Sequence, residues 1–348
     1  MTPRCALATL LFAAAASAAP FASLAGQSAS PAGYHVTHDL KLRGDGRWDY
    51  VTLDSVGHRL FIARQTRVMV VDPASGKLLG EVPGLNGAHG TALAYAAGHG
   101  FATSGRDSSV VMFDLRSLRV LARLKAADDA DAVLYDPASK RVFTFNGDAG
   151  TSTAIDPESG KVIGSIELGG KPEFGVADGS GRLYVNIEDK GEIAELDPVG
   201  LRVVRRWPLD GCEEPTGLAM DRAHDLLFSV CHSKVMAISD ARAGRTIAEV
   251  PIGGGVDGAA FDPGTGLAFA SNGEGSITVV HEDSPTTFHV VSTAATRRGA
   301  RTMTLDPRTH RLYTVTADFG ATPAPTTADP HPRPSLVPGT FSLLELDP

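Results

Sequence analysis

The chain has 348 residues, a hydrophobic content of 43% and a formal net charge of −8. Its 38 Gly and 22 Pro indicate a turn-rich, all-β protein rather than a helical one. The negative charge and the lack of a basic cluster argue against a nucleic acid as partner.

The N-terminus has the pattern of a cleaved signal peptide. Arg4 supplies the positive start, residues 6–16 form an apolar run, and small residues follow it. The run is too short to cross a bilayer, and no other stretch is long enough. We expect cleavage near Ala18 or Ala19 and a soluble periplasmic or secreted protein. The next segment, residues 20–33, is expected to be a flexible leader.

A repeat then runs along the rest of the chain. Each unit has an apolar strand that ends in Asp, a second strand with an apolar anchor, and a third strand that runs into a turn rich in Asp, Pro, Ser and Gly. Successive anchors lie 40 to 45 residues apart. The seven anchors are Leu60, Phe101, Val142, Leu183, Leu227, Leu267 and Leu312.

A period near 40 residues with several short strands is typical of a β-propeller blade. One unit cannot bury both faces of its sheet, so the units must stack around an axis. The repeat therefore predicts a single domain over residues 34–348. We expect a seven-bladed β-propeller with four-stranded antiparallel blades.

Both ends of the domain indicate how the ring closes. Residues 34–42 read as a strand with no blade before it, and residues 340–347 read as a third strand with no fourth strand after it. Pairing the two would complete the seventh blade and remove two exposed edges. We therefore expect an N-terminal strand that closes the last blade.

Loops that enter the innermost strands should surround the mouth of the central channel. The residue five places before each strand-ending Asp, or its equivalent, is polar or charged in most units, with His89 and Glu214 close by. Other loops of the same face carry Arg64, Arg106, Glu188, His232 and Asp318. The expected ligand-binding residues are Asp49, His89, Asp131, Glu173, Glu214, Asp257, Asn272 and Arg301.

Several interpretations of this acidic mouth remain open. The carboxylates could bond to backbone amides at strand starts, with Arg301 neutralising two of them. Alternatively, clustered carboxylates raise one another's pKa unless a cation offsets them, so the mouth would suit a divalent metal or a cationic or polyhydroxylated ligand.

Two further features lie on the loops. After Cys5 is removed with the signal peptide, Cys212 and Cys231 remain in an oxidising compartment, close together on one face of the fifth blade. We expect a disulfide between them, the alternative being two buried thiols. Residues 321–338, with six Pro, are expected to form a surface loop inserted in the seventh blade, the alternative being a lid or a docking peptide.

The chain resembles the YncE-like family of exported YVTN-repeat β-propellers over essentially the whole mature sequence. The resemblance implies seven blades and export, without an assigned reaction. The motifs that carry it are Trp48-Asp49-Tyr50-Val51-Thr52-Leu53-Asp54, Lys171-Pro172-Glu173-Phe174, Val185-Asn186-Ile187-Glu188-Asp189, Cys212-Glu213-Glu214-Pro215, Ser271-Asn272-Gly273-Glu274-Gly275 and Arg298-Gly299-Ala300-Arg301-Thr302.

Two functions are expected from these features. The first is a monomeric, non-catalytic binding or scaffold protein that captures a small ligand or a cell-envelope protein at the acidic face. The alternative is a lactonase-type hydrolase, by analogy with metal-dependent gluconolactonases of related architecture. There a calcium, zinc or manganese ion would polarise a carbonyl and activate a water. Its ligands would be Asp49, Glu173, Glu214 and Asp257, with Asn272 close by.

No haem-attachment, nucleophile-elbow, zinc-protease or phosphate-loop motif occurs in the sequence. No catalytic residue is therefore assigned, and the non-catalytic role is favoured.

Overall fold

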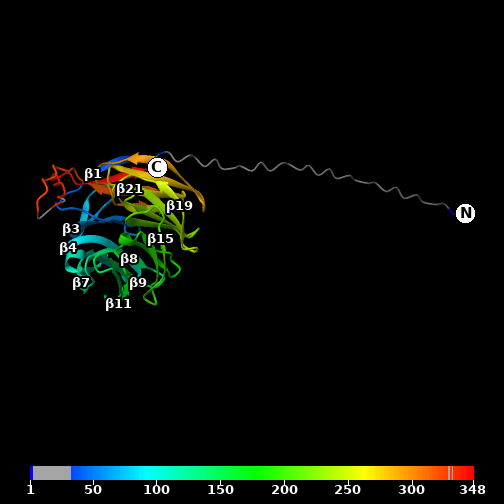
Figure 1. Ribbon diagram of the computed structural model, residues 1–348, viewed down its shortest axis with the longest axis horizontal. Helices are drawn as coiled ribbons and strands as arrows, with labels where there is room; N and C mark the ends of the chain where they lie inside the picture. Colours follow the sequence, from blue (N-terminus) through cyan, green and yellow to red (C-terminus); the bar gives the residue numbers. More distant parts are fainter. Residues whose placement is uncertain (3–32, 328–329, 331) are drawn as a thin grey trace. The chain divides into compact units, whose positions relative to one another are not determined.

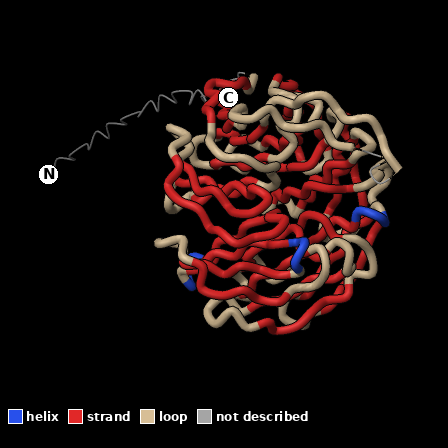
Figure 2. The backbone as a smooth tube through the Cα atoms, turned by 90° about the vertical axis from the view of Figure 1, so that its left-hand side faces the viewer, coloured by secondary structure: helices blue, strands red, loops and turns tan. Residues whose placement is uncertain are grey.

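The computed structural model describes residues 1–2, 33–327, 330 and 332–348. The expected signal peptide and leader fall almost entirely outside the described residues. Gly33–Pro348 forms one compact unit made of antiparallel strands joined by loops and turns (Figures 1 and 2). Helical structure in the described residues is limited to three short 3₁₀ turns, η1 (Tyr95–Ala97), η2 (Gly105–Asp107) and η3 (Glu188–Lys190). No helix there is both long and apolar enough to cross a bilayer.

The fold is an all-β propeller with four-stranded antiparallel blades. Four of the sheets each follow the chain from their first strand to their fourth. Their strands are β8 (Ala130–Asp136), β9 (Arg141–Asn146), β10 (Thr151–Ile155) and β11 (Val162–Glu167); β12 (Pro172–Ala177), β13 (Leu183–Ile187), β14 (Glu192–Asp197) and β15 (Arg202–Pro208); β16 (Pro215–Asp221), β17 (Leu226–Cys231), β18 (Val235–Asp240) and β19 (Arg245–Pro251); and β20 (Val256–Asp262), β21 (Leu267–Asn272), β22 (Ser276–Ser284) and β23 (Thr287–Ala295).

A fifth sheet joins the two ends of the propeller. It has the order β1-β26-β25-β24, so that the first strand lies beside the last one (Figure 1). The N-terminal strand thus completes a four-stranded blade, as the sequence predicts. The bounds are β1 (His35–Lys41), β24 (Met303–Asp306), β25 (Arg311–Thr316) and β26 (Ser342–Asp347).

The sixth sheet has six strands, so the described residues form six sheets where the repeat predicts seven separate blades. The difference arises in β3 and β4, which have 13 and 17 residues. The first part of β4 pairs with β3 and its last part pairs with β5, so one strand runs from one repeat into the next. The order is β2 (Val51–Asp54), β3 (Arg59–Val71), β4 (Leu78–Ala94), β5 (His99–Ser104), β6 (Ser109–Asp114) and β7 (Val120–Lys125).

The innermost strands touch one another in a closed circuit, in the order β2, β4, β8, β12, β16, β20, β24 and back to β2. The hydrophobic core lies between neighbouring sheets. Phe143 and Phe145 of β9, for example, pack with Leu183 and Val185 of β13. The loops that enter the inner strands are therefore brought around one axis.

The predicted disulfide between Cys212 and Cys231 is present, with the two Cα atoms 5.4 Å apart. It ties the loop before β16 to the end of β17. His232, the residue after Cys231, lines a cavity on this face of the propeller. The disulfide therefore fixes part of the wall of the candidate site.

Candidate functional site

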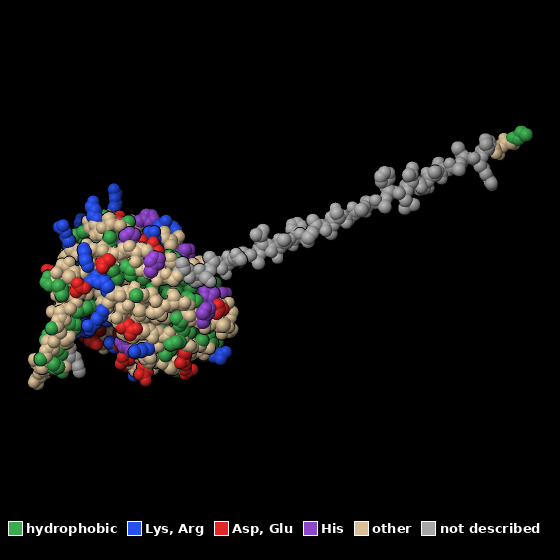
Figure 3. Space-filling view, turned by 90° about the horizontal axis from the view of Figure 1, so that it is seen from above, with side chains coloured by type: hydrophobic (Ala, Val, Ile, Leu, Met, Phe, Trp, Pro, Cys, Tyr) green, Lys and Arg blue, Asp and Glu red, His purple; other side chains and the backbone are tan. Residues whose placement is uncertain are grey.

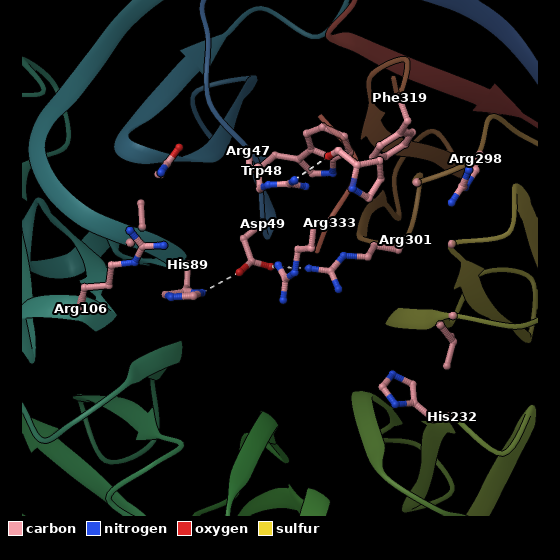
Figure 4. A pocket seen from close by; sticks show the side chains of 18 residues that line it. Arg47, Trp48, Asp49, His89, Arg106, His232, Arg298, Arg301, Phe319 and Arg333 are labelled. Atoms are coloured by element: carbon pink, nitrogen blue, oxygen red, sulfur yellow. Dashed lines mark hydrogen bonds and ion pairs between the residues drawn. The ribbon is translucent and has the colours of Figure 1, made fainter. Parts of the chain in front are cut away.

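A cavity of about 540 Å³ opens on the face where loops enter the inner strands (Figure 4). It is the size of a small-molecule site. Its charged and aromatic lining is Arg47, Trp48, Asp49, His89, Arg106, His232, Arg298, Arg301, Phe319 and Arg333.

Positive charge dominates this lining, although the sequence predicts an acidic face. Among the described residues, five arginines line the cavity and Asp49 is the one carboxylate beside them. Four of those arginines have no carboxylate within 4.0 Å in the described part of the chain, and the exception is Arg301. The charge of the cavity is therefore only partly balanced by the protein itself.

Arg47 shows the effect of this crowding. It is half-buried and donates a hydrogen bond of 2.7 Å to the backbone carbonyl of Pro334. Burial, and then the positive charges of Arg333 and Arg301, lower the pKa of its guanidinium. A bound anion would relieve this mutual repulsion.

Aromatic side chains form one wall of the cavity. The ring of Trp48 lies 6.1 Å from that of Phe319 and 5.4 Å from that of Phe341, measured between centroids. The guanidinium of Arg298 lies 5.4 Å from the centre of the Phe319 ring. The cavity thus combines cationic groups with a flat apolar surface.

The Pro-rich insertion contributes part of this site. Figure 1 shows the segment after β25, in orange-red, as a loop that projects from the strands. Its base is held by a bridge between Phe319 and Leu336 and by a 2.8 Å hydrogen bond from Val337 N to Asp318 O. These contacts place Arg333 and Pro334 at the cavity.

The carboxylates of the predicted mouth are paired with cations. His89 Nδ1 lies 2.6 Å from Asp49 Oδ2 and 3.2 Å from Asp131 Oδ1. Arg301 lies 3.4 Å from Asp257 and 3.9 Å from Asp49. Five of the eight predicted residues are therefore brought into one network.

Burial and the neighbouring charges together set the protonation of this network. Burial alone would lower the pKa of His89, but the hydrogen bond with Asp49 and the charges of Asp131 and Asp49 outweigh it and raise the pKa to about 9. Burial raises the pKa of Asp131 and of Asp257, against the opposing charges of His89 and Arg301. His89 is thus a cation at neutral pH.

Glu173 belongs to the same region but has its own partner. Burial, and then the charges of Asp131 and Glu188, raise the pKa of its carboxyl group, while Lys171 opposes the change. Lys171 Nζ lies 3.5 Å from Glu173 and 2.6 Å from Glu188. These contacts make Glu173 a buried neighbour of the network rather than part of the cavity wall.

The remaining predicted residues lie apart from this network. Glu214 is exposed and lies 2.8 Å from His232. Asn272 is fully buried in its blade, where its amide nitrogen donates to Ser276 and Thr278. Asn272 therefore has a structural role.

Arg64, predicted on the polar loops, is also buried. Its guanidinium lies 3.6 Å from the centre of the Phe341 ring and donates to the carbonyls of Gly44 and Gly46. These bonds hold the segment that leads to Arg47 and Trp48. Arg64 thus supports the cavity from behind.

The side chains at the mouth whose ligand atoms lie close enough together to hold a metal ion are not the predicted quartet. In the described residues, the ligand atoms that lie within 4.8 Å of one another here belong to Asp49, His89 and Asp131. Only the first of these is in the predicted quartet. One imidazole and two carboxylates are ligands that divalent cations such as zinc and manganese accept.

A second cavity, of about 620 Å³, lies along the inner strands. Tyr50 and Phe174 line it, with ring centroids 5.3 Å apart. Tyr50 is buried, and burial followed by the charges of Asp131, Asp257, Glu173 and Asp49 raises the pKa of its hydroxyl. Asp49 lines the first cavity and Tyr50 the second, so the segment just before β2 forms part of both walls.

Sequence reasoning missed the residues that give the cavity its character. Arg47, Trp48, Arg298, Phe319 and Arg333 lie in loops that do not repeat from blade to blade. Trp48 and Arg298 occur in motifs that resemble the YncE-like family, and Arg333 lies in the Pro-rich insertion, for which a lid is the alternative expectation. The motifs and the insertion thus indicate which segments differ from the repeat, but they do not predict that these side chains point into the cavity.

No family model and no curated protein matches the chain. Among solved structures, the chain is similar to one described as "Kuenenia stuttgartiensis Hydrazine Synthase". The TM-score is 0.67 at 16% sequence identity, and the match covers 78% of this chain and 94% of that chain. A likeness at this identity shows the fold alone, which is a β-propeller.

Proposed function

We propose that this protein is a binding protein that holds a small anionic ligand in the arginine-lined cavity. The observation that carries the proposal is the set of four guanidinium groups without a carboxylate partner in the described residues: those of Arg47, Arg106, Arg298 and Arg333. Guanidinium groups bind carboxylates and phosphates through paired hydrogen bonds, which fixes orientation as well as charge.

The wall formed by Trp48 and Phe319 adds a preference for a flat ligand. An aromatic or otherwise planar acid would place its ring against this wall and its charge among the arginines. The carboxylates beneath the cavity do not oppose this, because His89 and Arg301 compensate them. A cationic ligand, which the acidic interpretation favours, would meet repulsion at the rim.

The test is calorimetric titration with benzoate, cyclohexanecarboxylate, citrate and inorganic phosphate at low and high salt. Arg106→Gln and Arg333→Gln should each weaken binding of the best ligand about tenfold or more, since hydrogen bonds to charged groups contribute about 1.5–3 kcal/mol. Arg116→Gln, at an exposed turn on the opposite face, is the matched control. Absence of binding, or equal affinity in the parent and both cavity variants, contradicts the proposal.

A second candidate is the lactonase-type hydrolase, now with Asp49, His89 and Asp131 as the metal ligands. The grouping of their ligand atoms within 4.8 Å supports it. A metal ion there would replace the proton that His89 shares with the two carboxylates. The arginines would then orient the carboxylate product of ring opening.

Titration with zinc, manganese and calcium, with lactone hydrolysis measured in parallel, tests this candidate. Asp131→Asn should abolish metal uptake and turnover, whereas Arg333→Gln should leave metal uptake intact. Parent protein that takes up no ion and hydrolyses no lactone eliminates the hydrolase. Anion binding by chelator-treated protein would leave the first proposal standing.

We also propose that the six-stranded sheet is two blades that share β4, which makes seven blades in all. The closed circuit of inner strands supports this, because it contains seven members and the end of β4 is one of them. Five four-stranded sheets and two blades in the sixth sheet then account for the seven anchors of the repeat.

We infer in addition that the chain is an exported member of the YncE-like family. The motif resemblance, the signal-peptide pattern and the disulfide support this. The mass of the protein recovered from the cell envelope should show a start near residue 19 or 20. A cytoplasmic protein that keeps residues 1–19 would contradict it.

A further inference from the structure

The hairpin of β22 and β23 extends past the sheet that carries it. Both strands have nine residues, and β21 pairs with β22 only as far as His281. Beyond that point the two strands pair with each other through Glu282 with Phe288 and Ser284 with Thr287, and Glu282 N donates one further hydrogen bond of 2.9 Å to Gly266 O. The extension therefore has few backbone partners of its own.

Two histidines and an aspartate meet where this extension begins. His281 and His289 are direct cross-strand partners, and their ring centroids lie 5.7 Å apart. Asp283 bridges them: its Oδ1 lies 2.8 Å from Nδ1 of His281, and its Oδ2 lies 2.6 Å from Nδ1 of His289. All three side chains are partly exposed, at 33%, 53% and 39% for His281, His289 and Asp283.

The arrangement follows from the local pairing of the two strands. His281 and His289 are direct cross-strand partners, so their side chains lie on the same face. Asp283 has no cross-strand partner, because the register shifts between Glu282 and Ser284, and at this irregularity its carboxylate meets both rings. Their three ligand atoms lie within 4.8 Å of one another, close enough for one ion to contact all three.

We propose that His281, Asp283 and His289 bind a divalent transition-metal ion of the zinc, nickel or copper type, which cross-links the hairpin. Imidazole nitrogens with one carboxylate suit these ions, whereas magnesium and calcium prefer an all-oxygen set. Binding replaces the two Nδ1–H hydrogen bonds to Asp283 with bonds from both Nδ1 atoms and a carboxylate oxygen to the metal, and the protons that leave Nδ1 pass to solvent or to Nε2. Water fills the remaining positions.

This site is separate from the arginine cavity. β22 follows Gly273, which lines that cavity, and runs away from it toward the opposite face of the propeller. Histidine side chains are visible on the surface of the propeller in Figure 3. A metal at the hairpin would therefore neither need nor disturb anion binding.

The experiment is titration of the untagged full-length protein with zinc, nickel and copper, with magnesium and calcium for comparison. In a His89→Gln background, which removes the imidazole of the candidate metal group at the channel mouth, one transition-metal ion should bind per chain, raise the thermal midpoint, and show nitrogen splitting from two imidazoles in the copper electron paramagnetic resonance spectrum. His289→Gln should weaken this binding by more than about tenfold, the lower bound for losing a group that merely orients a metal ligand.

Two control variants address the other places where histidine meets carboxylates. His224 lies against Asp221 and Glu282 on the other side of β22, and His89 lies at the cavity. His224→Gln and His89→Gln should keep the hairpin ion. Binding that survives His289→Gln, or that is lost in either control, overturns the proposal, as does absence of transition-metal binding. Because His289→Gln leaves the arginines in place, anion titration reports separately on the cavity.

Discussion

At the scale of single residues, His89 sets the charge of the channel mouth. It lies between Asp49 and Asp131, both largely buried, and carries a positive charge at neutral pH. Without that charge, two carboxylates would face each other with little water around them. His89 therefore makes the acidic ring compatible with a folded propeller and leaves the arginines free for a ligand.

This role predicts a pH-dependent stability. The pKa of His89 is raised from 6.5 to about 9, so its contribution is fully present below about pH 6.5 and is lost as the pH rises through about 9. The free energy of unfolding should fall over this window by at most about 1.4 kcal/mol per pH unit. In His89→Gln the fall should be smaller, with lower stability at pH 6.5.

Denaturant unfolding at a series of pH values measures this effect. His58→Gln is the control, since His58 lies exposed in a turn and has no ion pair in the described residues. The raised pKa values of Asp131 and Asp257, about 7 and about 6, also make stability fall as the pH rises, but at lower pH, so a slope below about pH 7 should persist in the variant. An unchanged slope in His89→Gln would show that His89 does not carry the effect.

Single residues also show where sequence reasoning reached its limit. The positions of Asp49, Asp131, Asp257 and Arg301 follow from the repeat, because each stands at the same place before an inner strand. The position of Arg333 at the cavity cannot be predicted from the repeat. A long side chain in an inserted loop takes its direction from tertiary contacts, and the pairing of Phe319 with Leu336 provides them.

At the scale of elements, β1 is the strand whose loss should be most costly. It pairs along β26 and covers the last edge of the closing sheet. Tyr34 and Leu42, on either side of it, are buried. The strand pairs with residues about 300 positions further along the chain. The two ends of the ring are therefore held together by hydrogen bonds and side-chain packing, not by a covalent connection.

Deletion of residues 34–43 should therefore lower the free energy of unfolding by at least about 3 kcal/mol, from two buried side chains at about 1.5 kcal/mol each. His35→Ala, at an exposed position of the same strand, should change it little. Thermal and denaturant unfolding of the parent, the deletion variant and His35→Ala measure these differences in stability. A deletion variant that unfolds at the parent's midpoint would mean that β1 does not close the ring.

The elements also show what the repeat could and could not predict. Strand positions and the closing role of β1 follow from the apolar pattern, because each strand must bury its anchor between neighbouring sheets. The continuity of β4 does not. The residues between the two parts of that strand include Gly84 and Gly87, both with positive φ, and glycine there reads as a turn. Instead, Gln65 of β3 pairs with Ala88, so the part of β4 that contains these glycines continues the sheet.

At the scale of the whole propeller, the sequence predicts the architecture far better than the chemistry of its site. Architecture depends on a periodic pattern that recurs in every unit, so seven copies reinforce one conclusion. The cavity depends on Arg47, Trp48, Arg298 and Arg333, each of which occurs once. The residues that repeat from unit to unit predict an acidic ring. The residues that occur only once line the cavity at that ring with arginines.

Asp49 and Tyr50 are consecutive residues that line different cavities. Asp49 lines the arginine-rich cavity, and Tyr50 lines the second cavity, where its ring lies 5.3 Å from that of Phe174. One backbone segment therefore forms part of both walls. The anion proposed for the first cavity would contact a segment that also shapes the second one, so the two cavities would respond together to its binding.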